Sequence, residues 1–331
     1  MMQISADTKA ESLIKNYSSF SKFEETALAI FRYQKNSNPL YSKYCEALNR
    51  SKPTSLLEIP FLPISLFKKH VVSCADSHEV TFFSSGTTGT NPSKHFVHKL
   101  DFYKRSFKEA FQLFYGNPAD WTILALLPSY MERSGSSLIT MVEDLIQLSG
   151  KPENGFFLYE HENLYHQLKE NVEQGKKTML IGVSFALLDF IEKYTLPQND
   201  FLVVMETGGM KGRKKEMVRA ELHRELIGGF GTKTIHSEYG MTELLSQAYS
   251  KGLSRFNCPP WMRVVIREQD DPLSYTDFGR TGGINVIDFA NFHSCSFIGT
   301  QDLGRLHADG SFEVLGRFDS SEVRGCNLLV S

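Results

Sequence analysis

The sequence predicts an α/β protein, in which mostly parallel sheets are covered by helices and a smaller antiparallel subdomain is rich in β-strands. The first observation is that short apolar runs alternate with segments of helical periodicity between residues 76 and 258, as in βαβ units. The second is that strand-like runs follow one another at shorter spacing after Trp261. The third is composition, because 41% hydrophobic residues in a chain of 331 can bury a large core.

Three segments are expected along the chain, forming one unit overall. Residues 1–75 are predicted to form a helical cover, because apolar residues recur at helical spacing between residues 5 and 50. Two prolines exclude a continuous helix over residues 57–68, so an extended segment is predicted there. Residues 76–258 are expected to form the α/β core, and residues 259–331 the β-rich subdomain with a short C-terminal tail.

The alternation in the core predicts a largely parallel sheet that is covered on both faces. Ligands of such sheets bind beyond the carboxyl ends of the strands, so motifs at these ends are candidates for a site. The predicted elements are strand 80–83, helix 101–114, strand 121–127, helix 135–148, strand 179–183, helix 185–194, strand 201–205, a helix ending near residue 226, a short strand at 234–235, and later strands at 263–267, 283–289 and 312–315.

A loop of hydroxyl groups and glycines follows the first of these strands and is predicted to bind phosphate. Gly86 and Gly89 can adopt positive φ at little cost, which lets backbone N–H groups turn toward an anion. Lys94 adds a mobile positive charge. A solvated turn is the alternative, whereas a P-loop is excluded because no Gly-Lys-Ser/Thr stands at the required spacing. The hydroxyl donors are Ser84, Ser85, Thr87 and Thr88.

Two further motifs stand at predicted strand ends. In the second of them, Tyr239 can stack on a base and Thr242 can bond a phosphate oxygen. Glu243 can hold Mg²⁺ against a triphosphate. A tyrosine-glycine turn before an ordinary helix start is the alternative. The two motifs are Thr207-Gly208-Gly209 and His236-Ser237-Glu238-Tyr239-Gly240-Met241-Thr242-Glu243.

Two of these motifs resemble hallmarks of the adenylate-forming enzymes, which include acyl-CoA synthetases, luciferases and adenylation domains. Ser-Gly-Thr-Thr-Gly at 85–89 resembles the phosphate loop of that superfamily, although Asn91 and Ser93 depart from its ending before the lysine. Tyr-Gly-Met-Thr-Glu at 239–243 resembles its Tyr-Gly-x-Thr-Glu motif. The resemblance implies the large N-terminal domain of the adenylate-forming fold, ATP and Mg²⁺ as cofactors, Lys94 and Thr242 as catalytic groups, and nucleotide contacts from the phosphate loop, Gly208, Gly209, Tyr239 and Gly240.

Two later segments resemble further motifs of the superfamily, in the same order along the chain. Gly-Thr-Gln-Asp-Leu-Gly-Arg at 299–305 resembles Thr-Gly-Asp-Leu-Gly, which implies that Asp302 bonds the ribose hydroxyls. Gly-Arg-Phe-Asp at 316–319, followed by Arg-Gly, resembles the segment that leads into the family's small mobile domain. This resemblance implies that Arg317 faces the nucleotide.

Two departures narrow the resemblance to one branch. The sequence stops at Ser331, so the small C-terminal domain with its adenylation lysine is expected to be essentially absent. Residues 126–138 contain no histidine where many relatives carry one at the acyl site. These features, the run Pro-Ser-Tyr-x-Glu-Arg-x-Gly-Ser-Ser-Leu and the segment Ile-Pro-Phe-Leu-Pro-x-Ser-Leu-Phe-Lys resemble the acyl-protein synthetases of bacterial luminescence, the LuxE type.

That branch implies an acyl relay. A fatty acid or other carboxylic acid would be activated as acyl-AMP, moved to Cys326 and passed to an acyl-accepting reductase. Arg324 can lower the pKa of this thiol, and Gly325 leaves the backbone free to move. The alternatives are a buried structural cysteine, a ligase that acylates coenzyme A or a carrier protein in surface polysaccharide or secondary metabolism, and a non-catalytic adenylate-binding module.

Composition excludes several other classes. The net charge is −2 with interspersed signs, and the basic run at 211–215 is too short to indicate nucleic-acid binding. The N-terminus lacks the apolar region of a signal peptide and no stretch is long enough for a membrane span, so a cytoplasmic protein is expected. The five cysteines are scattered without Cys-x-x-Cys spacing, which favours neither disulfides nor a zinc site.

Overall fold

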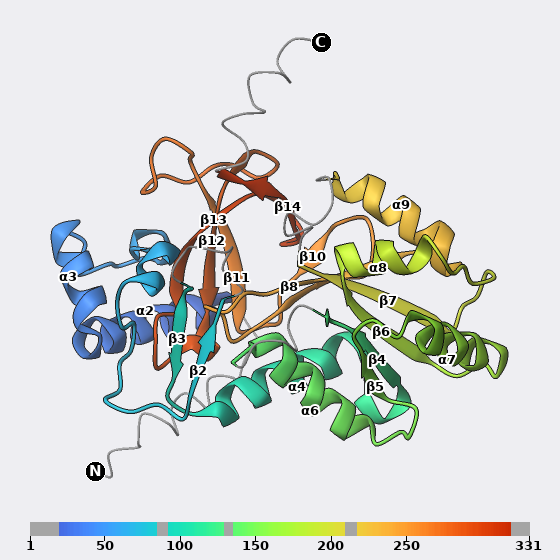
Figure 1. The fold of residues 1–331 in the computed structure, drawn as a ribbon. Coiled ribbons are helices and arrows are strands. Elements are labelled where there is room, and N and C mark those ends of the chain that lie inside the picture. Colours follow the sequence, from blue (N-terminus) through green and yellow to red (C-terminus); the bar gives the residue numbers. More distant parts are fainter. Residues whose placement is uncertain (1–19, 85–91, 129–134, 209–216, 319–331) are drawn as a thin grey trace.

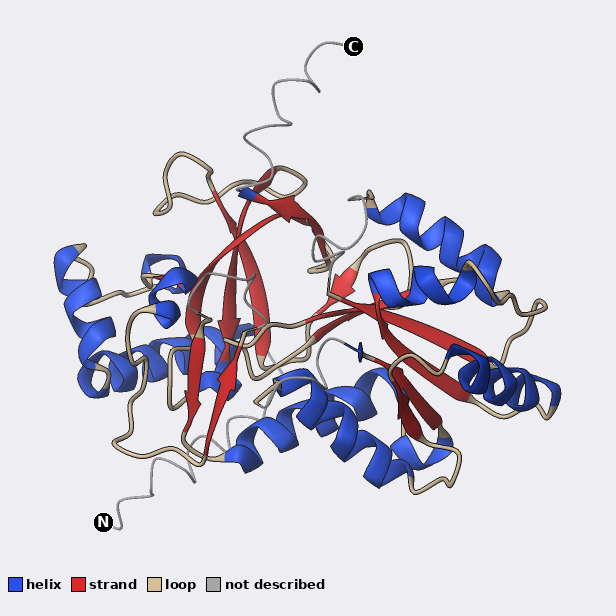
Figure 2. Cartoon of the chain, viewed as in Figure 1, coloured by secondary structure: helices blue, strands red, loops and turns tan. Residues whose placement is uncertain are grey.

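The computed structural model describes residues 20–84, 92–128, 135–208 and 217–318. Within them, a twelve-stranded sheet runs through the molecule (Figure 2). Its parallel half contains, in sheet order, β8 (Ile235–Tyr239), β7 (Leu202–Thr207), β6 (Thr178–Val183), β4 (Thr122–Leu126) and β5 (Gly155–Phe157). Its antiparallel half contains β11 (Met262–Arg267), β12 (Thr281–Asp288), β13 (Phe297–Leu306), β14 (Phe312–Arg317), β10 (Phe256–Asn257) and β9 (Ala248–Ser250), and β1 (Leu62–Pro63) pairs with β13. This arrangement confirms the predicted α/β class.

Helices cover the parallel half on both faces (Figure 1). On one face lie α7 (His161–Glu173), α8 (Ser184–Ile191) and α9 (Arg219–Phe230), and on the other lie α4 (Leu100–Tyr115) and α6 (Ser137–Ser149). Every residue of β4 and β6 is buried, as expected for parallel strands between two helical layers. Among the described residues, none of the helices combines the length and apolarity needed to cross a membrane.

The N-terminal helices pack against the antiparallel half. They are α2 (Phe20–Ser37) and α3 (Pro39–Ala47), and the Asn38 side chain caps the second by accepting from the backbone N–H of Leu40 and Tyr41. The ring of Tyr41 stacks on that of Phe297, with centroids 6.3 Å apart. These contacts cover one side of β13.

A separate two-stranded hairpin, β2 (Val80–Phe83) and β3 (Lys94–Val97), lies outside the large sheet. The ring of Phe82 packs against Tyr103 of α4, with centroids 5.2 Å apart. The backbone N–H of Phe83 also donates to the carbonyl of Gly135, ahead of α6. The hairpin is therefore fixed on the face of the sheet that α4 and α6 cover.

A buried hydrogen-bond network fixes the chain that follows β8. The carboxylate of Asp288 accepts from the backbone N–H groups of Leu245 and Ser246, both at 2.9 Å, and from the Ser246 hydroxyl at 2.6 Å. Asn291 donates to the carbonyl of Glu243 at 2.7 Å. These bonds satisfy backbone groups that burial would otherwise leave unpaired. They hold the segment from Glu243 to Ser246 in one conformation.

Several elements differ from the prediction. The short strand predicted at 234–235 continues through Tyr239, with residues 235, 237 and 239 buried in alternation. Residues 57–68 were predicted to be extended, but η1 (Leu56–Glu58) and η2 (Ile64–Lys68) are 3₁₀ turns around a two-residue strand, because proline limits rather than prevents local turns. The sequence pattern did not predict β5, α7 or β13, and the glycines and polar residues of β13 conceal its strand character. The remaining short elements are η3 (Pro118–Asp120) and η4 (Phe289–Asn291).

Candidate active site

The base of the predicted phosphate loop is closed by two serines. The backbone N–H of Ser84 donates to the carbonyl of Ser93 at 3.1 Å, and the N–H of Ser93 donates to the Ser84 hydroxyl at 2.8 Å. Ser93 is buried and closes the loop, although it departs from the superfamily pattern that the loop resembles. Lys94 follows as the exposed first residue of β3, opposite Phe83.

Glu243 lies beside this base and is only 6% exposed. Burial raises the pKa of its carboxyl, while a hydrogen bond from the Ser93 side chain and the charges of Lys68 and Arg317 act in the opposite direction. A bound cation would stabilise the charged form of a buried carboxyl of this kind. Proteins usually hold Mg²⁺ by one or two carboxylates together with the phosphates of a nucleotide, so a single glutamate fits that role. No group of three His, Cys, Asp or Glu side chains within the described ranges is arranged as a metal site.

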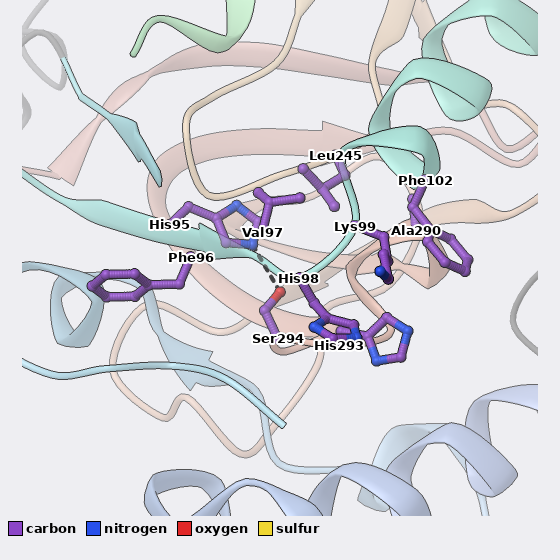
Figure 3. A pocket seen from close by; sticks show the side chains of 10 residues that line it. All are labelled: His95, Phe96, Val97, His98, Lys99, Phe102, Leu245, Ala290, His293 and Ser294. Atoms are coloured by element: carbon purple, nitrogen blue, oxygen red, sulfur yellow. Dashed lines mark hydrogen bonds between the residues drawn. The ribbon is translucent and has the colours of Figure 1, made fainter. Parts of the chain in front are cut away.

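His95 connects the hairpin to the motif that contains Glu243. Its Nδ1 lies 2.9 Å from the carbonyl oxygen of Thr242. Its Nε2 lies 2.8 Å from the Ser294 hydroxyl, the contact drawn as a dashed line in Figure 3. Burial lowers the pKa of the imidazole to about 4. The neutral ring therefore donates from Nδ1 to the carbonyl and accepts at Nε2. Figure 3 shows the small pocket beside it, where the rings of His98 and His293 lie 4.8 Å apart.

Glutamine in place of His95 is expected to reduce the loss of stability in acid. The imidazole has its ordinary pKa of 6.5 when unfolded and a pKa of about 4 when folded. Between these values the unfolded state binds more protons, so the wild type loses stability as pH falls through this window. Urea unfolding at about pH 7 and about pH 4.5 should show that the wild type loses roughly 2 kcal/mol more than the variant. Equal losses would contradict a neutral buried ring.

Tyr239, Asp302 and Arg317 come together at one end of β8. The Tyr239 hydroxyl donates to Oδ2 of Asp302 at 2.9 Å, and Nε of Arg317 lies 3.7 Å from Oδ1 of Asp302. Burial raises the pKa of Asp302 despite the Tyr239 bond and the nearby charges of Arg317, Arg267 and Arg219. Three residues that the sequence assigned to nucleotide binding thus form one contact group. The charge of Arg317 also lowers the pKa of Glu243, so Arg317 lies within electrostatic range of that carboxyl.

An ion cluster that sequence reasoning missed supports the end of β7. Oε1 of buried Glu206 lies 3.7 Å from Nε of Arg219 and 3.5 Å from Nε2 of His223. Burial alone would raise the pKa of Glu206, but the neighbouring His223 side chain and the Arg219 charge hold it below its usual value. Ser184 donates both to Glu206, at 3.1 Å, and to the carbonyl of Gly208, at 2.8 Å. Gly208 has φ of 72°, which favours glycine there.

Glu238, inside the motif at 236–243, was also not singled out. The Thr207 hydroxyl donates to its Oε2 at 2.6 Å, and burial raises the pKa of the carboxyl to about 7. Gly240 lies against this carboxyl, because a Cβ at that position would meet Oε1 of Glu238 and the carboxyl would have to shift. The remaining predicted site residues lie outside the described ranges and stay predictions; they are Ser85, Gly86, Thr87, Thr88, Gly89, Gly209 and Cys326.

No family model and no curated protein matches the sequence, but solved structures match the fold. An open conformation of 2-hydroxyisobutyryl-CoA ligase with 2-HIB-AMP and CoA has a TM-score of 0.67 at 12% identity, over 92% of this chain and 71% of that one. ATP-bound MatB from Rhodopseudomonas palustris has a TM-score of 0.54 at 16% identity, over 72% of this chain and 47% of MatB. The third structure is MenE, the O-succinylbenzoate coenzyme A synthetase from Bacillus subtilis, in complex with ATP and magnesium. It has a TM-score of 0.51 at 19% identity, over 74% of this chain and 51% of MenE. The chain thus spans about half the length of MatB and MenE and shares the fold of these enzymes.

Proposed function

We propose that the chain activates a carboxylic acid with ATP, forming an acyl-AMP and pyrophosphate. The observation that carries this proposal is the contact group of Tyr239, Asp302 and Arg317 beside buried Glu243, at the base of the predicted phosphate loop. These residues come from separate motifs and meet where the strands of the parallel half end, the usual place for a ligand. Structures with the same fold were solved with ATP, with ATP and magnesium, and with 2-HIB-AMP and CoA, which supports this reaction.

Each residue has a role in the proposed reaction. An oxygen of the substrate carboxylate attacks the α-phosphorus of ATP, and the bond from that phosphorus to pyrophosphate breaks. Such a step depends on alignment and charge neutralisation more than on covalent help. Asp302 accepts from the ribose hydroxyls, and Tyr239 holds it in place. Lys94 and Thr242 bind phosphate oxygens. Glu243 would hold Mg²⁺, which would supply positive charge beside the phosphates.

We further infer from the sequence resemblance that the acid is a fatty acid and that the acyl group moves to Cys326. The thiolate attacks the acyl carbonyl carbon, and the carbon–oxygen bond to AMP breaks. A thioester keeps the acyl group reactive while the nucleotide leaves. A reductase or a carrier protein is the proposed final acceptor.

Acid-dependent release of AMP and pyrophosphate tests the first step. The protein is incubated with ATP, Mg²⁺ and a panel of carboxylic acids, and ATP–pyrophosphate exchange is measured in parallel. Exchange with at least one acid is expected. Tight AMP binding by calorimetry without exchange for any acid would instead identify a non-catalytic adenylate-binding module.

Phenylalanine in place of Tyr239 is expected to raise the KM for ATP roughly tenfold, because a buried acceptor that loses its donor costs about 1–3 kcal/mol. The ring remains, and with it the packing on Phe256 and Phe312 at 5.9 and 5.4 Å between centroids. Steady-state kinetics at saturating acid give the measurement. Tyr159→Phe, at a tyrosine that is 63% exposed, serves as the matched control. An unchanged KM in Tyr239→Phe would remove Asp302 from nucleotide binding.

A further inference from the structure

A row of polar side chains crosses three strands on the face of the sheet that α4 covers. Thr207 of β7 pairs with Glu238 of β8, and Glu238 pairs with Tyr249 of β9. Residues paired in this way project from the same face, so their side chains are neighbours. The ring of Tyr249 lies 5.2 Å from that of Phe114 and 5.5 Å from that of Tyr115, both in α4, which identifies the face. We call Thr207, Glu238 and Tyr249 the polar row.

The polar row contains hydrogen-bonding capacity that the described residues do not use. Thr207 occupies Oε2 of Glu238 at 2.6 Å, whereas no described residue bonds Oε1. The Tyr249 hydroxyl and Oε1 of Gln247 are buried, and neither finds a partner among the described residues. Gln247 belongs to the same place, because a Cβ on Gly240 would lie 3.3 Å from its Cγ as well as against Oε1 of Glu238. Unpaired buried polar groups are costly, so such a group in a folded protein requires an explanation.

The row lies across the strand end from the proposed nucleotide contacts. Tyr239 follows Glu238 directly and projects from the opposite face of β8, where it meets Asp302. Tyr103, whose pKa is raised by burial and by the charge of Glu238, packs on Phe82 of the hairpin that carries the predicted phosphate loop. The polar row and the proposed nucleotide contacts therefore lie on opposite faces of the same strand end.

We propose that the polar row selects the acid, and that the acid carries a hydroxyl or amino group near its carboxylate, which donates to Oε1 of Glu238. This inference rests on the proposed function and narrows its substrate class. Oε1 of Gln247 is an acceptor, and Oε1 of Glu238 accepts when the carboxyl is ionised, so a donor on the substrate matches both groups. An unsubstituted chain would bury the row without satisfying it, and sites that bury polar groups reject ligands lacking the partner.

The test compares matched acids in ATP–pyrophosphate exchange by the full chain. At a short and a long chain length, the straight-chain acid is set against its 2-hydroxy, 3-hydroxy and 2-amino derivatives. At least one derivative is expected to exceed its parent by roughly tenfold or more in kcat/KM. A preference for the amine identifies an ion pair with Glu238, and a preference for a hydroxyl identifies a neutral hydrogen bond. If the straight-chain acids react as well as all of their derivatives, the inference is overturned while acid activation stands. If no acid supports exchange, the proposed function itself is overturned.

Variants then assign the preference to the row. Glu238→Leu is expected to reduce kcat/KM for the preferred derivative at least tenfold, relative to its parent acid, and so to abolish the preference. Tyr249→Phe keeps the ring packing and removes only the hydroxyl, so a reduced preference is expected there without loss of the fold. Glu225→Gln, at an exposed glutamate of α9, is the matched control and should keep the full preference. A preference that survives both Glu238→Leu and Tyr249→Phe overturns the assignment.

Discussion

Glutamine in place of Glu243 is expected to lower acid-dependent AMP formation by roughly a hundredfold or more, the usual effect of removing one electrostatic contact to a reacting group. The substitution keeps size and removes the charge that would hold Mg²⁺. Folding should be unaffected, because burial raises the pKa of Glu243 and the charged form gains little from the fold itself. The carbonyl of residue 243 keeps its bond from Asn291 at 2.7 Å, so the segment stays in place.

Initial rates over a range of Mg²⁺ concentrations, together with thermal unfolding, provide the measurement. The defect should persist at high Mg²⁺, and the melting temperature should match that of the wild type. Glu225→Gln again serves as the control for a neutralised surface glutamate. Activity near that of the wild type at low Mg²⁺ would show that Glu243 is only a buried structural carboxyl.

Serine in place of Cys326 is expected to abolish retention of acyl label while acyl-AMP still forms. The four cysteines within the described residues are poor nucleophiles. Burial raises the pKa of Cys45, Cys74 and Cys258 to about 12 in each case, and it raises the pKa of Cys295 further. A thiol needs its thiolate form to attack, so these side chains would react slowly near neutral pH. Cys326 lies outside the described residues and remains the proposed acceptor.

Radiolabelled fatty acid, gel separation and neutral hydroxylamine treatment measure the thioester. Wild-type label should be released by hydroxylamine, and Cys326→Ser should carry none. Cys74→Ser is the matched control, because this thiol is partly exposed and yet should not carry the acyl group. Mass spectrometry that finds the acyl group on another cysteine, or on none, would falsify the relay and favour transfer to coenzyme A or a carrier protein.

Strand ends were predictable from the sequence, whereas the contacts of individual side chains were not. Val80 to Phe83 forms the strand predicted there, and the end of β7 lies within two residues of its expected place, because buried strands leave a continuous apolar run. The strand β13 was not predicted because six of its ten residues are glycine or polar. The role of His95 was not predicted for a different reason, because its partner Thr242 lies 147 positions away in the sequence.

By itself, the sequence determined the alternating α/β order and the segments in which motif residues stand, because periodicity and local composition are properties of neighbouring residues. Only the tertiary structure decided which of those residues meet. That Tyr239 bonds Asp302 and Glu238 bonds Thr207 on opposite faces of β8 depends on strand order and register. A register shift of one residue would exchange these faces, and no local pattern specifies the register between strands so far apart in the chain.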